Sequence, residues 1–150
     1  MLKEGQKAPN FTLTDHDGKP VSLKDFLGKT VVVYFYPKDM TPGCTQEACD
    51  FRDNWNAVKK KGAVVLGVSA DPLKRHQAFR DKYELPFTLL SDEKKETLKA
   101  YGVWQKKKFM GKEFMGIVRT TLIIDGEGKI KKIWSPVSVN DHVKDILGNL

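Results

Sequence analysis

The sequence predicts an α/β fold, a central mixed β-sheet flanked by helices, with a short β-hairpin added at the N-terminus. Two continuous runs of apolar, mainly β-branched and aromatic residues, 31–36 and 63–69, are typical of strands buried on both faces of a sheet. Each run is followed by a loop and then by apolar residues at helical spacing. Two more strand patterns and a last helical pattern follow, so strands and helices alternate as in layered α/β domains.

The N-terminal segment predicts a hairpin. Its strands are Phe11–Leu13 and Val21–Leu23, and Asp17-Gly18 is the turn signal between them. Residues 22–26 predict a helical turn that ends at Gly28.

The buried strand 31–36 ends at Pro37 and leads into the loop 41–43, Thr-Pro-Gly. Helical spacing then begins at Cys44 and continues to Gly62. The apolar positions of this helix are Ala48, Phe51, Trp55 and Val58. The pattern therefore places Cys44 in the first helical turn.

The second half of the chain repeats this alternation. Strand 63–69 precedes a helix to Tyr83, with Asp71 as N-cap and Pro72 at the first helical position. The next predicted elements are a strand 87–90, a helix from residue 91 or 92 to 101, a less regular stretch 103–116, strands 120–124 and 129–134, and a helix from residue 140 or 141. The order β-α-β-α, then β-β-α, is that of the thioredoxin fold.

Composition limits the class of protein. With 150 residues and 40% hydrophobic content, residues 1–150 suit one compact domain. The N-terminus lacks a secretory apolar core, and no run approaches the ~20 apolar residues of a membrane span. We therefore expect a cytoplasmic protein without a membrane partner.

The net charge of +7 raises the alternative of nucleic-acid binding. The lysines, however, lie in separate segments among acidic residues, and no nucleic-acid motif accompanies them. Solvated surface lysines without a nucleic-acid partner are the expectation.

Cys44 is the main candidate for chemistry. The first turn of a helix has backbone N–H groups without partners, and these favour an anion such as a thiolate, the reactive form of cysteine. The alternative is a small buried hydrophobic residue. A Pro/Gly loop at the carboxyl end of a buried strand favours the functional interpretation, because ligands commonly bind there in open α/β sheets.

Six residues form a recognisable constellation: Pro37, Thr41, Cys44, Glu47, Cys49 and Arg119. The pattern PxxxTxxCxxE, with an Arg-Thr strand start far downstream, resembles the peroxiredoxins. The second cysteine, five residues after the first, narrows the resemblance to the bacterioferritin comigratory protein or peroxiredoxin Q group. The resemblance extends from about residue 11 to 147 and includes FYPKDMTPGCTQEACDFRD, VVLGVSAD, LPFTLLSD, YGVW and RTTLIID. Met40 departs from it, because an acidic or amide residue is common there.

The resemblance implies a thioredoxin-dependent, atypical 2-Cys peroxidase that reduces hydrogen peroxide and organic hydroperoxides. Cys44 would be the nucleophile that becomes a sulfenic acid, and Cys49 would resolve it to an intramolecular disulfide, reduced in turn by thioredoxin. Thr41 would place its hydroxyl beside the sulfur and the peroxide, the alternative being a helix cap. Pro37 would fix the loop that shields the sulfur.

Arg119 and Glu47 would complete the site. The guanidinium of Arg119 would stabilise the thiolate and the charge that passes to the leaving oxygen. Glu47, one turn after Cys44, would hold Arg119 by a bidentate contact. The alternative for this pair is an ordinary ion pair.

No metal and no cofactor are expected. The three histidines, His16, His76 and His142, lie in different segments and are expected at the surface. The apolar cluster Phe109, Met110, Phe114 and Met115 is expected to pack in the core or an interface, with an apolar collar for organic hydroperoxides as the alternative.

Two other classes of function remain open at the level of the residues. A disulfide reductase of the thioredoxin type expects C-x-x-C, and a basic binding module needs neither Thr41 nor Arg119. The preferred hydroperoxide and the reductant, thioredoxin or glutaredoxin, also stay open. A monomer is the expectation, with a dimer as the alternative.

Overall fold

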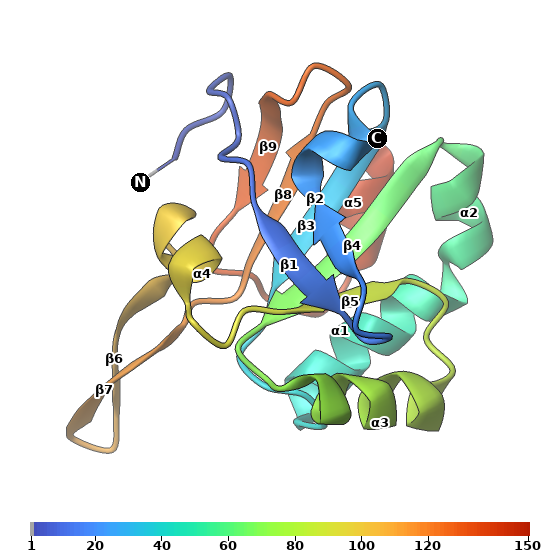
Figure 1. Ribbon diagram of the computed structural model, residues 1–150. Coiled ribbons are helices and arrows are strands. Elements are labelled where there is room, and N and C mark those ends of the chain that lie inside the picture. Colours follow the sequence, from blue (N-terminus) through green and yellow to red (C-terminus); the bar gives the residue numbers. More distant parts are fainter. Residues whose placement is uncertain (1) are drawn as a thin grey trace.

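The computed structural model describes residues 2–150 and contains a seven-stranded mixed β-sheet packed between helices (Figure 1). In spatial order the strands are β2 (Pro20–Ser22), β1 (Thr12–Asp15), β5 (Thr88–Ser91), β4 (Ala63–Ser69), β3 (Thr30–Phe35), β8 (Thr120–Ile124) and β9 (Ile130–Trp134). Strands β3, β4 and β5 are parallel, whereas β8 pairs with β3 antiparallel. The predicted sheet and the N-terminal hairpin, β1 with β2, are confirmed.

Strand β3, which lies between β4 and β8, is buried on both faces. Val31, Val33 and Phe35 belong to one core, and Val32 and Tyr34 belong to the other. The helices are η1 (Leu23–Phe26), α1 (Pro42–Asp53), α2 (Trp55–Lys60), α3 (Leu73–Tyr83), α4 (Glu96–Ala100) and α5 (His142–Asn149). Side chains of η1 and α4 join the first core, while those of α1, α2, α3 and α5 join the second. Successive side chains of a strand point to opposite faces of the sheet, so neighbouring residues of β3 join different cores.

The single helix predicted from Cys44 to Gly62 is wrong, because the chain forms two helices, α1 and α2, separated at Asn54. The amide Nδ2 of Asn54 donates to the carbonyl of Asp50 at 2.8 Å. Short polar side chains compete in this way for backbone groups that a continuous helix would use.

Helices α3 and α4 also begin later than predicted. Pro72, and not Asp71, is the N-cap residue of α3, and the Asp71 carboxylate instead accepts the backbone N–H of Asp39 at 2.8 Å. Helix α4 begins only at Glu96, after Lys95 in a left-handed conformation with φ 64°.

Residues 103–116 are more regular than predicted. Strands β6 (Trp104–Phe109) and β7 (Lys112–Ile117) form an antiparallel hairpin that extends away from the large sheet (Figure 1). Phe109 is 68% and Met110 87% exposed, and Phe114 and Met115 are about half exposed, so the prediction that this cluster packs in the core is wrong. Among residues 2–150 no helix has the length and apolar character needed to span a membrane.

Candidate active site

Cys44 lies where the sequence predicts it, in the first turn of α1 and beyond the carboxyl end of β3. It is the third residue of the helix, after Pro42 and Gly43, and only 1% of its surface is exposed. Backbone N–H groups of this turn have no partners within the helix and favour a negative sulfur. The local sequence therefore buries a thiol at a position suited to a thiolate.

Arg119 contacts both Cys44 and Glu47. Its Nη2 lies 3.2 Å from the Cys44 Sγ, and its Nη1 lies 2.8 Å from the Glu47 Oε1. Arg119 is brought there by the short connection between β7 and β8, 75 residues along the chain from Cys44. The predicted convergence is present, but the predicted bidentate contact is wrong, since Glu47 uses one oxygen and its buried Oε2 has no partner among the described residues.

Burial and mutual contact shift the pKa values of Glu47 and Arg119. Burial raises the pKa of Glu47 from 4.5 to about 7, although the Arg119 guanidinium opposes the shift. Burial by itself would lower the pKa of Arg119, yet Cys44 and Glu47 together raise it, so the guanidinium stays charged. Near neutral pH Glu47 is therefore partly protonated.

Gly43 also belongs to the site, although the sequence predicts for it only a place in the Thr-Pro-Gly loop. A Cβ at this position would lie 3.1 Å from the Arg119 Nη2, closer than ordinary van der Waals contact. The missing side chain therefore makes room for the guanidinium beside the sulfur. The available signal was a glycine inside the first turn of a helix, where its helix propensity is poor.

Thr41 and Pro37 lie in the loop before α1. Thr41 is the N-cap residue, but its side chain makes no capping bond; the hydroxyl donates instead to the Lys38 carbonyl at 2.8 Å. The oxygen lone pairs of Thr41 therefore remain able to accept a hydrogen bond. Pro37 follows shortly after the end of β3 and is exposed.

Cys49 lies on the same helix as Cys44, five residues later, and both thiols are free. It is half-buried, and burial raises its pKa. On a regular helix five residues separate Cα atoms by about 8.7 Å, beyond the ~4.4 to 6.8 Å that a disulfide spans.

The expectation of surface histidines is wrong, because His16, His76 and His142 are all buried. His142 Nε2 lies 2.8 Å from the Thr121 hydroxyl, and burial lowers the pKa of His142 to about 4. Burial also lowers the pKa of His16, whose Nδ1 accepts the Leu89 N–H. Each ring contacts a segment distant in the chain, at Leu89, Leu90 or Thr121, and spacing along the chain does not report such contacts.

His76 groups with Asp39 and Asp71, three side chains of the kind that bind metals. The atoms that could bind a metal already have hydrogen-bond partners. His76 Nδ1 lies 2.6 Å from Asp39 Oδ2, and His76 Nε2 lies 2.9 Å from the Leu90 carbonyl. The Asp71 carboxylate accepts hydrogen bonds from the Asp39 N–H and the Ser69 hydroxyl. The cluster is therefore a hydrogen-bonded network.

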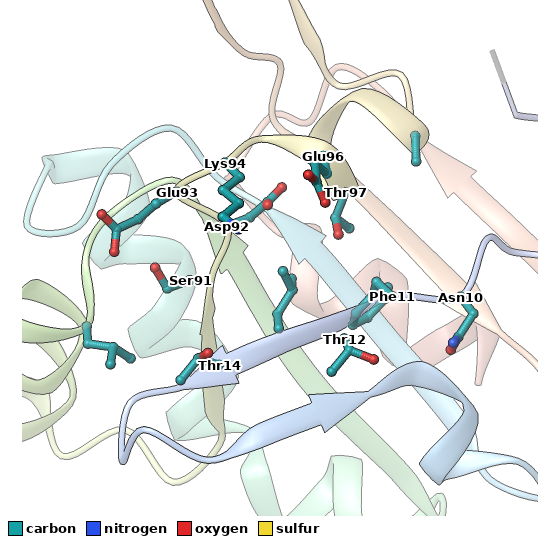
Figure 2. A pocket seen from close by; sticks show the side chains of 13 residues that line it. Asn10, Phe11, Thr12, Thr14, Ser91, Asp92, Glu93, Lys94, Glu96 and Thr97 are labelled. Atoms are coloured by element: carbon teal, nitrogen blue, oxygen red, sulfur yellow. The ribbon is translucent and has the colours of Figure 1, made fainter.

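A pocket of about 700 Å³ lies away from the thiol, between β1, the end of β5 and the segment before α4 (Figure 2). Thr14 and Ser91 are cross-strand partners on its rim. Asp92 accepts the Leu98 N–H at 2.8 Å and so stabilises the start of α4. Cys44 and Arg119 are not part of this pocket.

Fold and site together define a thiol-based redox enzyme with a thioredoxin-like fold, in which an arginine faces a buried cysteine at a helix start. The AhpC/TSA family model matches residues 4–133, and the chain belongs to this family. It is 52% identical over 149 residues, 99% of both chains, to the putative peroxiredoxin bcp of Coxiella burnetii. It is 50% identical to peroxiredoxin Bcp of Bacillus subtilis, covering 99% of this chain and 95% of that one.

Solved structures of bacterioferritin comigratory protein and peroxiredoxin Q are also similar to this chain. The Xanthomonas campestris bacterioferritin comigratory protein is similar with a TM-score of 0.91 and 34% identity, over 97% of this chain and 96% of that chain. The structure of a Xylella fastidiosa PrxQ mutant is similar with a TM-score of 0.93 and 31% identity, over 99% of this chain and 94% of that chain. The protein is thus a peroxiredoxin of the Bcp/peroxiredoxin Q group, a thiol peroxidase.

Proposed function

We propose that Cys44 is the nucleophile of this peroxidase and that Arg119, Glu47, Thr41 and Pro37 form its site. The observation that supports this most directly is the 3.2 Å contact between the Arg119 guanidinium and the sulfur of a buried cysteine. The thiolate attacks one peroxide oxygen, the O–O bond breaks, and the sulfur is oxidised to a sulfenic acid. The other oxygen leaves as water or an alcohol after it takes up a proton.

The remaining residues have distinct roles in the proposal. Arg119 stabilises the thiolate and then the negative charge on the leaving oxygen. Glu47 orients Arg119, and the Thr41 oxygen accepts a hydrogen bond from the peroxide. Pro37 restricts the backbone of the loop, since its φ is fixed.

Cys49 is the proposed resolving residue. Its thiol attacks the sulfenic sulfur, a disulfide forms and water leaves; a dithiol protein then reduces the disulfide by thiol–disulfide exchange. Both thiols are on α1, so the helix must open for this step.

Substrates and partners follow from the relatives. The Xanthomonas campestris bacterioferritin comigratory protein has alkyl peroxide reduction activity, which supports organic hydroperoxides beside hydrogen peroxide for this chain. Thioredoxin is the proposed reductant, and a monomer is the proposed state. A thiol that must return to its reduced form suits a reducing compartment, which supports a cytoplasmic location.

The nucleophile is tested with Cys44→Ser. A hydroxyl does not supply the attacking anion at neutral pH, so peroxide reduction should be abolished. Consumption of hydrogen peroxide is measured with thioredoxin and its reductase. Turnover by Cys44→Ser within about tenfold of wild type would refute the assignment.

Cys49→Ser tests resolution separately. The first reaction with one equivalent of peroxide should proceed, whereas recycling by thioredoxin should stop because no resolving thiol is nearby. Mass spectrometry should then find sulfenic and later sulfinic acid on Cys44. Normal recycling of this variant would show that Cys49 is not the resolving residue.

A further inference from the structure

Asp39 lies in the loop before α1 and is completely buried. All its polar groups have partners. Its N–H donates to Asp71 Oδ2 at 2.8 Å, and its carbonyl accepts from Arg75 Nη2 at 2.9 Å. Its carboxylate accepts the Tyr36 hydroxyl on one oxygen and faces His76 Nδ1 on the other. We call this set, Tyr36, Asp39, Asp71, Arg75 and His76, the Asp39 clamp.

The clamp is itself fixed to the sheet. His76 Nε2 lies 2.9 Å from the carbonyl of Leu90 on β5, an oxygen that can only accept. Nε2 therefore has the proton of that bond, and His76 connects Asp39 to β5. The Ser69 hydroxyl at the end of β4 donates to Asp71 at 2.7 Å, so Asp71 connects Asp39 to β4.

One peptide group joins the clamp to the active site. The Asp39 N–H, held by Asp71, belongs to the same peptide as the Lys38 carbonyl, which accepts the Thr41 hydroxyl at 2.8 Å. A peptide is planar, so fixing the N–H also fixes the direction of the carbonyl. The Thr41 hydroxyl must then point its hydrogen at Lys38 and present its lone pairs to another donor.

We propose that Asp39, Asp71 and His76 are positioning residues for the peroxidase reaction, which orient the Thr41 hydroxyl through the Lys38–Asp39 peptide. They do not touch the sulfur. The inference rests on the proposed function, because it assigns a task to Thr41 in accepting a hydrogen bond from the hydroperoxide. A purely structural network would affect stability alone, so the test must separate stability from rate.

Two substitutions of His76 make that separation. In His76→Asn, the amide Nδ2 can take the place of the ring Nδ1 beside Asp39 and donate to the carboxylate. In His76→Gln, the amide Nε2 can replace the ring Nε2 at Leu90, while the contact with Asp39 is lost. Both remove ring volume, and asparagine removes more, so His76→Asn should be the less stable of the two.

The rate constant of the Cys44 thiol with hydrogen peroxide is measured by stopped flow on reduced protein, together with the unfolding midpoint. His76→Gln should react about tenfold or more slowly, because small misplacements of a site group cost large factors in rate. His76→Asn should stay within about threefold of wild type despite its lower stability. Equal slowing in both variants, or none in His76→Gln, would overturn the proposal.

A double-mutant cycle tests the route through Thr41. Thr41→Val removes the hydroxyl, so adding His76→Gln to it should cause little further slowing. If the two effects multiply, the clamp does not act through Thr41. Should His76→Gln fail to fold, Asp71→Ala, which removes the acceptor of the Asp39 N–H, takes its place with the same expectations.

The wild-type rate distinguishes this inference from the proposed function. Wild-type protein that reacts no faster than free cysteine would refute the function itself. A fast wild type with an equally fast His76→Gln would refute only the positioning role.

Discussion

The carboxyl group of Glu47 links the site to pH. Its folded-state pKa of about 7 is above 4.5, so the folded state binds more protons than the unfolded state between these values. The stability from this group is fully present below pH ~4.5 and is lost as the pH rises through ~7. As the pH rises above ~7, Glu47 becomes a buried carboxylate beside Arg119, and the free energy of unfolding is lower as a result.

Glu47→Gln should remove this dependence, because an amide does not titrate. The free energy of unfolding of the variant should rise relative to wild type by about 1 to 3 kcal/mol between pH 5 and pH 8. Urea unfolding at several pH values measures the difference. A constant difference across this range would show that Glu47 does not titrate there.

Gly43→Ala should lower activity without lowering stability. Alanine favours the helix by about 1 kcal/mol, but its Cβ would crowd the Arg119 Nη2 from 3.1 Å and displace the guanidinium from the sulfur. Loss of a charge-assisted contact predicts a tenfold or greater slowing with peroxide, since such a contact contributes ~1.5 to 3 kcal/mol.

Gly148→Ala is the matched control for this substitution. Gly148 lies on α5, and a Cβ there meets no atom within 4 Å. The control should therefore gain similar stability with an unchanged peroxide rate. An unchanged rate in Gly43→Ala as well would mean that Arg119 tolerates the displacement.

At the scale of elements, the end of α3 is strained. Glu84 follows α3 with φ 51°, a left-handed conformation that favours glycine, and its side chain is exposed. Glu84→Gly should stabilise the protein by up to about 1 kcal/mol, or ~2 to 4 °C in Tm. Ala78→Gly, exposed within the same helix, should destabilise it by ~1 kcal/mol. Calorimetry that finds the same sign for both would contradict the strain.

Buried strands were the elements best predicted from the sequence. Strands β4 and β8 have the predicted bounds, and β3 differs by one residue at each end. The continuous apolar composition of these strands indicates burial on both faces, and this prediction needs no knowledge of distant contacts. The position of Cys44 in the first helical turn followed from the local pattern, whereas its contact with Arg119, far along the chain, and the role of Glu47 followed from the resemblance.

Features that depend on backbone strain or on distant partners were missed. The β6–β7 hairpin turns at Met110 and Gly111, both with positive φ, and methionine is not a usual turn residue there. Asp71 looked like a helix cap, because its local pattern fits one. Its partner Asp39 is 32 residues away and could not be recognised from spacing.

At the scale of the whole molecule, the redox cycle requires one segment to open while the rest stays folded. Disulfide formation should unwind residues 42–50, because about 8.7 Å between Cα atoms is too long for a disulfide. Oxidised protein should therefore show faster amide exchange across 44–50 than reduced protein. Exchange across α3, at 73–83, is the internal control and should stay the same.

Identical exchange in the two states, with the Cys44–Cys49 disulfide confirmed by mass, would contradict this expectation. It would mean that the reduced protein in solution does not hold both cysteines on one regular helix.

The projecting hairpin exposes thioethers on an enzyme that works in peroxide. Met110 is 87% and Met115 50% exposed, whereas Met40 is partly buried beside the second core. Exposed methionine is oxidised to the sulfoxide, a polar group. Under excess peroxide, peptide mapping should find sulfoxide at Met110 before Met40, and the reverse order would contradict this. The hairpin would then act as a sacrificial antioxidant surface, whose repair depends on methionine sulfoxide reductases and not on the dithiol that restores Cys44.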